Sequence, residues 1–133
     1  MYRIKILLTI IFGGINFEEM IYIIEDDLSV RRAYEFFPDS EGMEYKSSGT
    51  VRSFLTGYMP TMRDLLVLDI NLPNLSGLDL LKIFTRERKK IPVIVVTARD
   101  DAECRECCTE YGVKDYLRKP VDGEELIEII NSS

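Results

Sequence analysis

Short apolar runs that end in a polar or charged residue recur along this chain. Residues 21–24, 65–68 and 93–96 are three such runs, and residues 113–117 form a fourth, less apolar one. Short runs rich in β-branched residues are typical of strands in parallel sheets, whose two faces are both covered by other elements. The pattern therefore predicts a buried sheet whose strands each lead directly into polar residues.

Helical patterns alternate with these runs. Four ranges carry apolar side chains at helical spacing: residues 29–37, 50–58, 78–86 and 101–111. A last helix is expected to begin at Asp122, and residues 43–46 are expected to form a weaker strand. Pro38 and Gly112 stand where two of the helices are expected to end. Repeated strand–helix units predict an α/β fold, in which a parallel sheet carries helices on both faces.

Length and charge restrict the classes of function. A chain of 133 residues is expected to form one domain with a single core. Its formal net charge of −6 argues against direct nucleic-acid binding by this segment. The chain contains no histidine, so it cannot use histidine as a base or a metal ligand. Any phosphohistidine that takes part in its function must belong to another protein.

The three cysteines lie close together at positions 104, 107 and 108. Their odd number and crowding do not suit a disulfide framework, so we expect the reducing environment of the cytoplasm. A metal site is disfavoured because no histidine or fourth ligand accompanies them. We expect Cys107 and Cys108 to take the place of small buried residues in a helix.

Residues 1–19 differ from the rest of the chain. Arg3 and Lys5 precede an apolar run at residues 6–12, which is too short to span a bilayer. No pair of small residues suited to signal-peptide cleavage follows this run. We expect residues 1–19 to be an N-terminal appendage of uncertain role and residues 20–133 to be the functional domain, with no membrane association.

Acidic residues follow two of the predicted strands. Glu25 and Asp26 come after the first strand, and Asp69 ends the third. Ligands of such sheets bind outside the carboxyl ends of the strands. Carboxylates crowded there raise each other's pKa unless a cation intervenes, and Mg²⁺ is a hard cation that needs few protein ligands. The alternative is an acidic surface cluster at the starts of loops.

Three further side chains suit the binding of an anion at this edge. Thr97 offers a hydroxyl at the end of the fourth strand, small Ala98 leaves room beside it, and Lys119 follows the fifth strand with a positive charge. Together they form an oxyanion-binding pocket around Asp69 as a carboxylate nucleophile. Phosphoryl transfer requires mainly positioning and charge neutralisation, so this set predicts the formation of an aspartyl phosphate.

Four motifs resemble the receiver (CheY-like) domain of two-component response regulators. They occupy residues 23–26, 67–77, 95–98 and 115–120, in the order and at close to the spacing of that family. The resemblance covers about residues 20 to 131. It implies a flavodoxin-like, doubly wound sheet of five parallel strands in the order 2-1-3-4-5.

The resemblance also assigns roles to individual residues. Asp69 becomes the phosphoacceptor, and its donor is a sensor histidine kinase or a phosphotransfer protein. Mg²⁺ is expected on Glu25, Asp26, Asp69 and the backbone carbonyl of Asn71. Phosphoryl binding and switching fall to Thr97, Ala98, Lys119 and Tyr116. The Lys119–Pro120 peptide bond is expected to be cis.

In such a domain the output is a change of surface and not turnover of a substrate. Phosphorylation draws Thr97 toward the phosphoryl group, and Tyr116 then turns inward. The face made by the helix at 101–111, the strand at 113–117 and the last helix changes, and a partner or a second copy of the chain binds it. The domain would thus act in phosphorelay signal transduction, assisting its own phosphorylation and dephosphorylation without being a conventional enzyme.

Three other interpretations fit parts of this sequence. A phosphatase of the haloacid dehalogenase type would place a second aspartate two residues after the nucleophile, where this chain has Asn71. A flavodoxin-like cofactor binder would need a phosphate-cradling loop after the first strand, where the acidic residues 25–27 would repel phosphate. The chain also fits the receiver half of a longer transcription factor.

Overall fold

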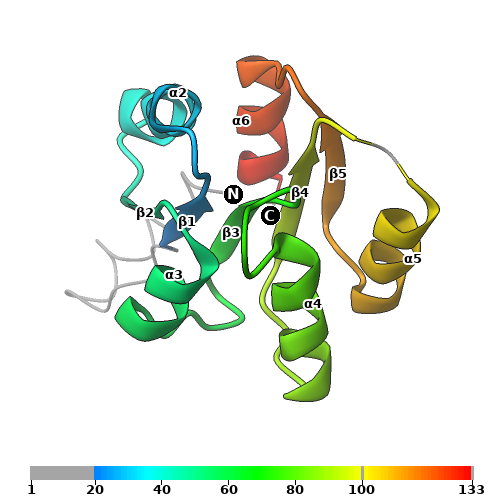
Figure 1. The fold of residues 1–133 in the computed structure, drawn as a ribbon. Coiled ribbons are helices and arrows are strands. Elements are labelled where there is room, and N and C mark those ends of the chain that lie inside the picture. Colours follow the sequence, from blue (N-terminus) through cyan, green and yellow to red (C-terminus); the bar gives the residue numbers. More distant parts are fainter. Residues whose placement is uncertain (1–19, 100, 133) are drawn as a thin grey trace.

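Figure 1 shows the computed structural model, which describes residues 20–99 and 101–132. The elements in chain order are β1 (Ile21–Ile24), α2 (Leu28–Ser40), β2 (Tyr45–Ser48), α3 (Val51–Gly57), β3 (Leu65–Asp69), α4 (Gly77–Arg86), β4 (Val93–Thr97), α5 (Ala102–Tyr111), β5 (Asp115–Arg118) and α6 (Gly123–Asn131). The strands of this described part are parallel, in the order β2-β1-β3-β4-β5. The predicted fold class is confirmed. The appendage expected at residues 1–19 lies outside the described residues.

Helices cover both faces of the sheet, and every residue of β1 and β4 is buried. On one face α2 and α6 bury Tyr34 and Leu126 against the strands. On the other face α3, α4 and α5 bury Phe54, Leu81 and Cys108. The two cores explain why the central strands are apolar without alternation. No helix in the described segments has the length and apolar character needed to cross a membrane.

The three cysteines belong to the core under α5. All are free thiols, and Cys104, Cys107 and Cys108 are only 1%, 8% and 3% exposed. Burial raises the pKa of Cys107, and it raises the pKa of Cys108 to about 12. These two thiols therefore stay protonated at neutral pH and behave as small apolar side chains, as predicted.

The start of α4 holds the loop after β3 in place. Ser76 and Asp79 form a capping box, in which each side chain accepts a hydrogen bond from the other residue's backbone N–H. Gly77 lies so close to this loop that a Cβ atom there would be 2.7 Å from the carbonyl oxygen of Asp69. Only glycine permits this approach, which brings α4 directly against the end of β3.

Three predicted elements have bounds that differ from the structure by two residues or more. Pro38 does not end α2: it is buried inside the helix, which continues to Ser40, and the N–H of Glu41 still donates to the carbonyl of Phe37. The second strand is 45–48 and not 43–46, since the N–H of Met43 closes the turn after α2 on the carbonyl of Pro38. The fifth strand begins at Asp115, because the N–H of Val113 caps α5 on the carbonyl of Cys108.

Candidate functional site

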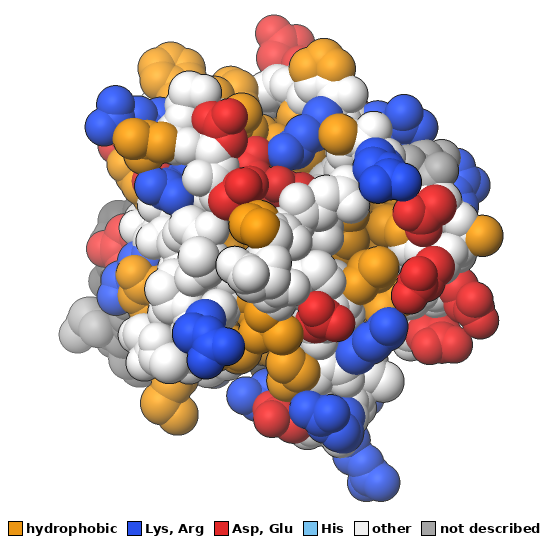
Figure 2. Space-filling view, in the orientation of Figure 1, with side chains coloured by type: hydrophobic (Ala, Val, Ile, Leu, Met, Phe, Trp, Pro, Cys, Tyr) orange, Lys and Arg blue, Asp and Glu red, His pale blue; other side chains and the backbone are white. Residues whose placement is uncertain are grey.

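The structure brings three acidic side chains together at the carboxyl ends of two adjacent strands. Asp69 is the last residue of β3, and Glu25 and Asp26 follow β1, which pairs with β3. One carboxylate oxygen of each lies within 4.8 Å of those of the other two. Glu25 is fully buried and Asp69 is 3% exposed, whereas Asp26 is exposed. Figure 2 shows acidic side chains in the upper middle of the molecular face that it draws.

Lys119 reaches the same cluster from the loop after β5. Its Nζ lies 2.8 Å from Glu25 Oε1 and 3.1 Å from Asp69 Oδ2. Burial alone would lower the pKa of Lys119, but the hydrogen bonds and charges of Glu25 and Asp69 outweigh it and raise that pKa. Burial and neighbouring Asp69 raise the pKa of Glu25 to about 8, although Lys119 opposes this. The ammonium is thus a permanent cation against Asp69.

The donor set fits a hard divalent cation. Glu25, Asp26 and Asp69 bring their carboxylate oxygens close together, and Mg²⁺ prefers oxygen ligands and retains waters. The backbone N–H of Asn71 donates to Asp69 Oδ1 at 3.1 Å, which orients the carboxylate. Asn71 itself is exposed and stands two residues beyond Asp69.

Thr97 and Ala98 complete the edge at the end of β4. The Thr97 side chain is buried, and its Oγ1 accepts hydrogen bonds from Asn71 Nδ2 at 2.9 Å and from the backbone N–H of Arg99 at 3.0 Å. The same hydroxyl donates to the carbonyl oxygen of Arg99. Ala98 is exposed beside it. The side-chain bond from Asn71 to Thr97 was not predicted, because only the folded sheet brings these residues together.

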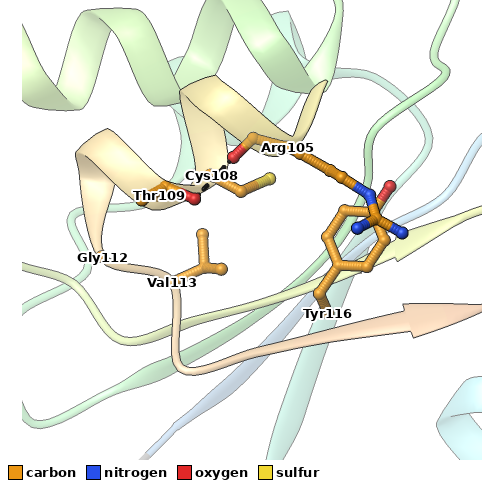
Figure 3. A pocket seen from close by; sticks show the side chains of 6 residues that line it. All are labelled: Arg105, Cys108, Thr109, Gly112, Val113 and Tyr116. Atoms are coloured by element: carbon orange, nitrogen blue, oxygen red, sulfur yellow. Dashed lines mark hydrogen bonds between the residues drawn. The ribbon is translucent and has the colours of Figure 1, made fainter. Parts of the chain in front are cut away.

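Tyr116 lies in β5 and packs against the core that contains the cysteines of α5. It is half-buried, and its hydroxyl is 3.5 Å from the sulfur of Cys104 on α5. Figure 3 shows its ring beside a cavity of about 490 Å³ between α5 and β5. The lining residues are Arg105, Cys108, Thr109, Gly112, Val113 and Tyr116. This cavity lies between two of the elements, α5 and β5, whose surface is expected to change on phosphorylation.

A family comparison accounts for this arrangement. The model of the response regulator receiver domain matches residues 21–131, which is most of the chain. The chain belongs to this family. The Lys119–Pro120 peptide bond of this receiver domain is cis, as the resemblance implies.

Individual relatives and structures agree with the family. The receiver domain is 34% identical over 111 residues to Nodulation protein W of Bradyrhizobium diazoefficiens, covering 84% of this chain and 49% of that protein. It is 36% identical over 112 residues to sensory transduction protein RegX3 of Mycolicibacterium smegmatis, with coverage of 84% and 49%. The chain thus spans about half the length of these curated relatives. A response regulator receiver protein from Pseudomonas putida superposes with a TM-score of 0.76 at 27% identity, covering 87% and 98% of the two chains.

A second cavity of the receiver domain opens beside Lys119. Its volume is about 520 Å³, and it lies between α2 and the loop after β5. Its lining is mainly apolar and consists of Ser29, Val30, Ala33, Tyr34, Lys119, Pro120 and Val121. Two exposed apolar side chains of α2, Leu28 and Phe36, are 49% and 64% exposed. This groove could not be predicted from the sequence, because its two walls, residues 29–34 and 119–121, are far apart along the chain.

Proposed function

We propose that this receiver domain accepts a phosphoryl group on Asp69 from a phosphohistidine of a sensor histidine kinase or phosphotransfer protein. Mg²⁺ would be held by Glu25, Asp26, Asp69 and the backbone carbonyl of Asn71. The observation that carries the proposal is the 3.1 Å contact between Lys119 Nζ and Asp69 Oδ2 within the cluster of Glu25, Asp26 and Asp69. A nearly buried carboxylate between a fixed cation and two further acids suits a nucleophile toward phosphorus.

The reaction exchanges one bond to phosphorus for another. A carboxylate oxygen of Asp69 attacks the phosphorus, an O–P bond forms, and the N–P bond breaks with its electron pair remaining on the donor imidazole. Because this chain has no histidine, that imidazole comes from the partner. Lys119 offsets the charge on the phosphoryl oxygens, and bound Mg²⁺ supplies further positive charge there. Acetyl phosphate with Mg²⁺ tests the step directly, by the mass that the intact protein gains.

The switch would begin at Thr97. In the unphosphorylated structure its hydroxyl is hydrogen-bonded to Asn71 and Arg99. A phosphoryl oxygen on Asp69 would offer that hydroxyl a stronger, charged acceptor. When Thr97 exchanges these bonds, the end of β4 shifts and Tyr116 repacks against the cavity under α5. The face of α5, β5 and α6 then binds an effector or a second copy of the chain. The free thiols on α5 suit a reducing cytoplasm.

Beryllofluoride, a mimic of the phosphoryl group, tests this switch. With Mg²⁺ present, we expect amide shifts across residues 97–120, including Cys104 and Tyr116, in a heteronuclear NMR spectrum. Asp69→Asn, which lacks the carboxylate that binds the mimic, should show none of them. Shifts confined to the acidic cluster, with those of α5 and β5 unchanged, would contradict the switch.

The groove beside Lys119 is the surface that the phosphohistidine donor would contact. It is continuous with the Asp69 site through Lys119, and its apolar lining suits a protein partner. Ala33→Glu, which places a charge in the groove, should slow transfer from a phosphorylated kinase or phosphotransfer protein by at least about tenfold. The rate with acetyl phosphate should not change, because that donor does not need the groove. Thr56→Glu, at an exposed position of α3, is the matched control, and equal slowing in both variants would contradict the assignment.

Residue 71 argues against a phosphatase of the haloacid dehalogenase type. Asn71 stands where an acid/base aspartate would be required, and its side-chain amide donates to Thr97. An amide cannot take or return a proton at neutral pH. The site therefore favours a transient aspartyl phosphate over turnover of phosphate esters.

A further inference from the structure

Arg31, in the first turns of α2, bridges two loops beside the acidic cluster. Its Nη1 donates to the backbone carbonyl of Glu25 at 3.0 Å. The same nitrogen lies against Gly49, where an added Cβ atom would be only 2.8 Å away. The two loops are also linked directly, because the N–H of Glu25 donates to the carbonyl of Ser48 at 3.1 Å. The guanidinium is thus held between the end of β1 and the end of β2.

This contact acts on the peptide that carries both members of the acid pair. The carbonyl of Glu25 begins the peptide unit that ends at the N–H of Asp26, and that N–H donates to Glu25 Oε2 at 3.1 Å. A charged donor on this carbonyl forms a stronger bond than a neutral one. We propose that Arg31 is a positioning residue: it anchors the Glu25–Asp26 peptide and so keeps both carboxylates directed at the metal. This inference rests on the proposed binding of Mg²⁺ by these acids.

The proposal predicts the direction in which the Mg²⁺ affinity changes when Arg31 is removed. A guanidinium near the acid pair repels a second cation, so if Arg31 acted only through its charge, its removal would tighten Mg²⁺ binding. If Arg31 positions the acids, its removal weakens binding, as loss of a group that orients metal ligands does. The direction of the change in Mg²⁺ affinity therefore separates the two roles.

The first variant is Arg31→Met, with Arg32→Met as its control. Arg32 is the next residue of α2 and is exposed, so its substitution changes the net charge equally. We expect the Kd for Mg²⁺, measured by titration of backbone amide signals, to rise about tenfold in Arg31→Met and to stay near the wild-type value in Arg32→Met. Phosphorylation by acetyl phosphate should need more Mg²⁺ for half-saturation, with its maximal rate little changed.

The second variant, Gly49→Ala, leaves Arg31 in the chain. The new methyl group would displace the guanidinium, and the atoms it meets are the end of a flexible side chain, so the fold should be retained. We expect a weaker Mg²⁺ affinity that does not fall further when Arg31→Met is added, since both changes remove one contact. Gly49→Ala thus tests the proposal even if Arg31→Met does not fold.

The outcomes distinguish this inference from the proposed function. A wild-type domain that binds no Mg²⁺ would overturn both. Normal binding by the wild type, with equal or tighter binding by Arg31→Met and Gly49→Ala, would overturn the role of Arg31 alone. An equal loss in Arg32→Met would do the same, because it would trace the effect to something other than the Glu25 carbonyl. Weaker binding confined to Arg31→Met and Gly49→Ala supports the proposal.

Discussion

Asp69→Asn is expected to abolish phosphorylation of this chain. Incubated with acetyl phosphate and Mg²⁺, the wild-type protein should gain the mass of one phosphoryl group, and the variant should gain none. The reason is that the asparagine amide lacks the negatively charged oxygen that forms the O–P bond. Asp39→Asn, at an exposed position of α2, is the control and should be phosphorylated like the wild type. An equal mass gain in Asp69→Asn would place the acceptor elsewhere.

The fold of Asp69→Asn should survive, which makes the loss interpretable. Asparagine has nearly the shape of aspartate, and Lys119 keeps its 2.8 Å contact with Glu25. Removing one of the crowded negative charges also lessens their repulsion. The thermal unfolding midpoint without metal should therefore equal or exceed that of the wild type. A clearly lower midpoint would mean that Asp69 supports the fold beyond its role as nucleophile.

Lys119→Met is expected to cause the largest loss of stability among the site variants. It leaves Glu25 fully buried and Asp69 3% exposed without the cation that now contacts both. Removing one partner of a buried ion pair costs about 3 kcal/mol or more of unfolding free energy. Because Glu25 can be protonated once Lys119 is gone, we expect the loss to be close to about 3 kcal/mol. Urea denaturation at neutral pH in the presence of a chelator measures it.

Two comparisons make the Lys119 result specific. Lys82→Met removes an exposed lysine of α4 that is 3.5 Å from Glu103, and such surface pairs contribute less than about 1 kcal/mol. Adding Mg²⁺ should restore part of the stability of Lys119→Met, because a cation that binds only the folded acids stabilises the folded state. If Lys119→Met were as stable as Lys82→Met without metal, the buried charges would not depend on Lys119.

Much of the site could be predicted because of how parallel sheets are built. Short apolar runs that end in polar residues, such as 65–68, favour buried strands, and the carboxyl ends of parallel strands meet at one edge. Asp69 and Glu25 follow such runs, so their proximity follows from topology before any contact is known. The acidic residues at this edge could then be interpreted together, although they are more than forty positions apart in the chain.

Other parts could not be predicted, because they depend on how loops and helix ends pack. Pro38 looked like the end of a helix, yet α2 continues past it to Ser40 with Pro38 buried. Nothing in the sequence pairs Arg31 with the Glu25 carbonyl or Asn71 with Thr97. Arginine and asparagine are common on surfaces, so their type carries no such signal.

The amino-acid sequence by itself determined the order of strands and helices and the polar residues at the strand ends, because burial periodicity and chain direction are local properties. Only the tertiary structure decided which hydrogen bonds surround Asp69. Lys119 contacts two acids, Asn71 holds Thr97, and Arg31 holds the Glu25 carbonyl, and each contact joins separate segments or loops. Such contacts exist only at distances of a few ångström, which the packed sheet and helices set.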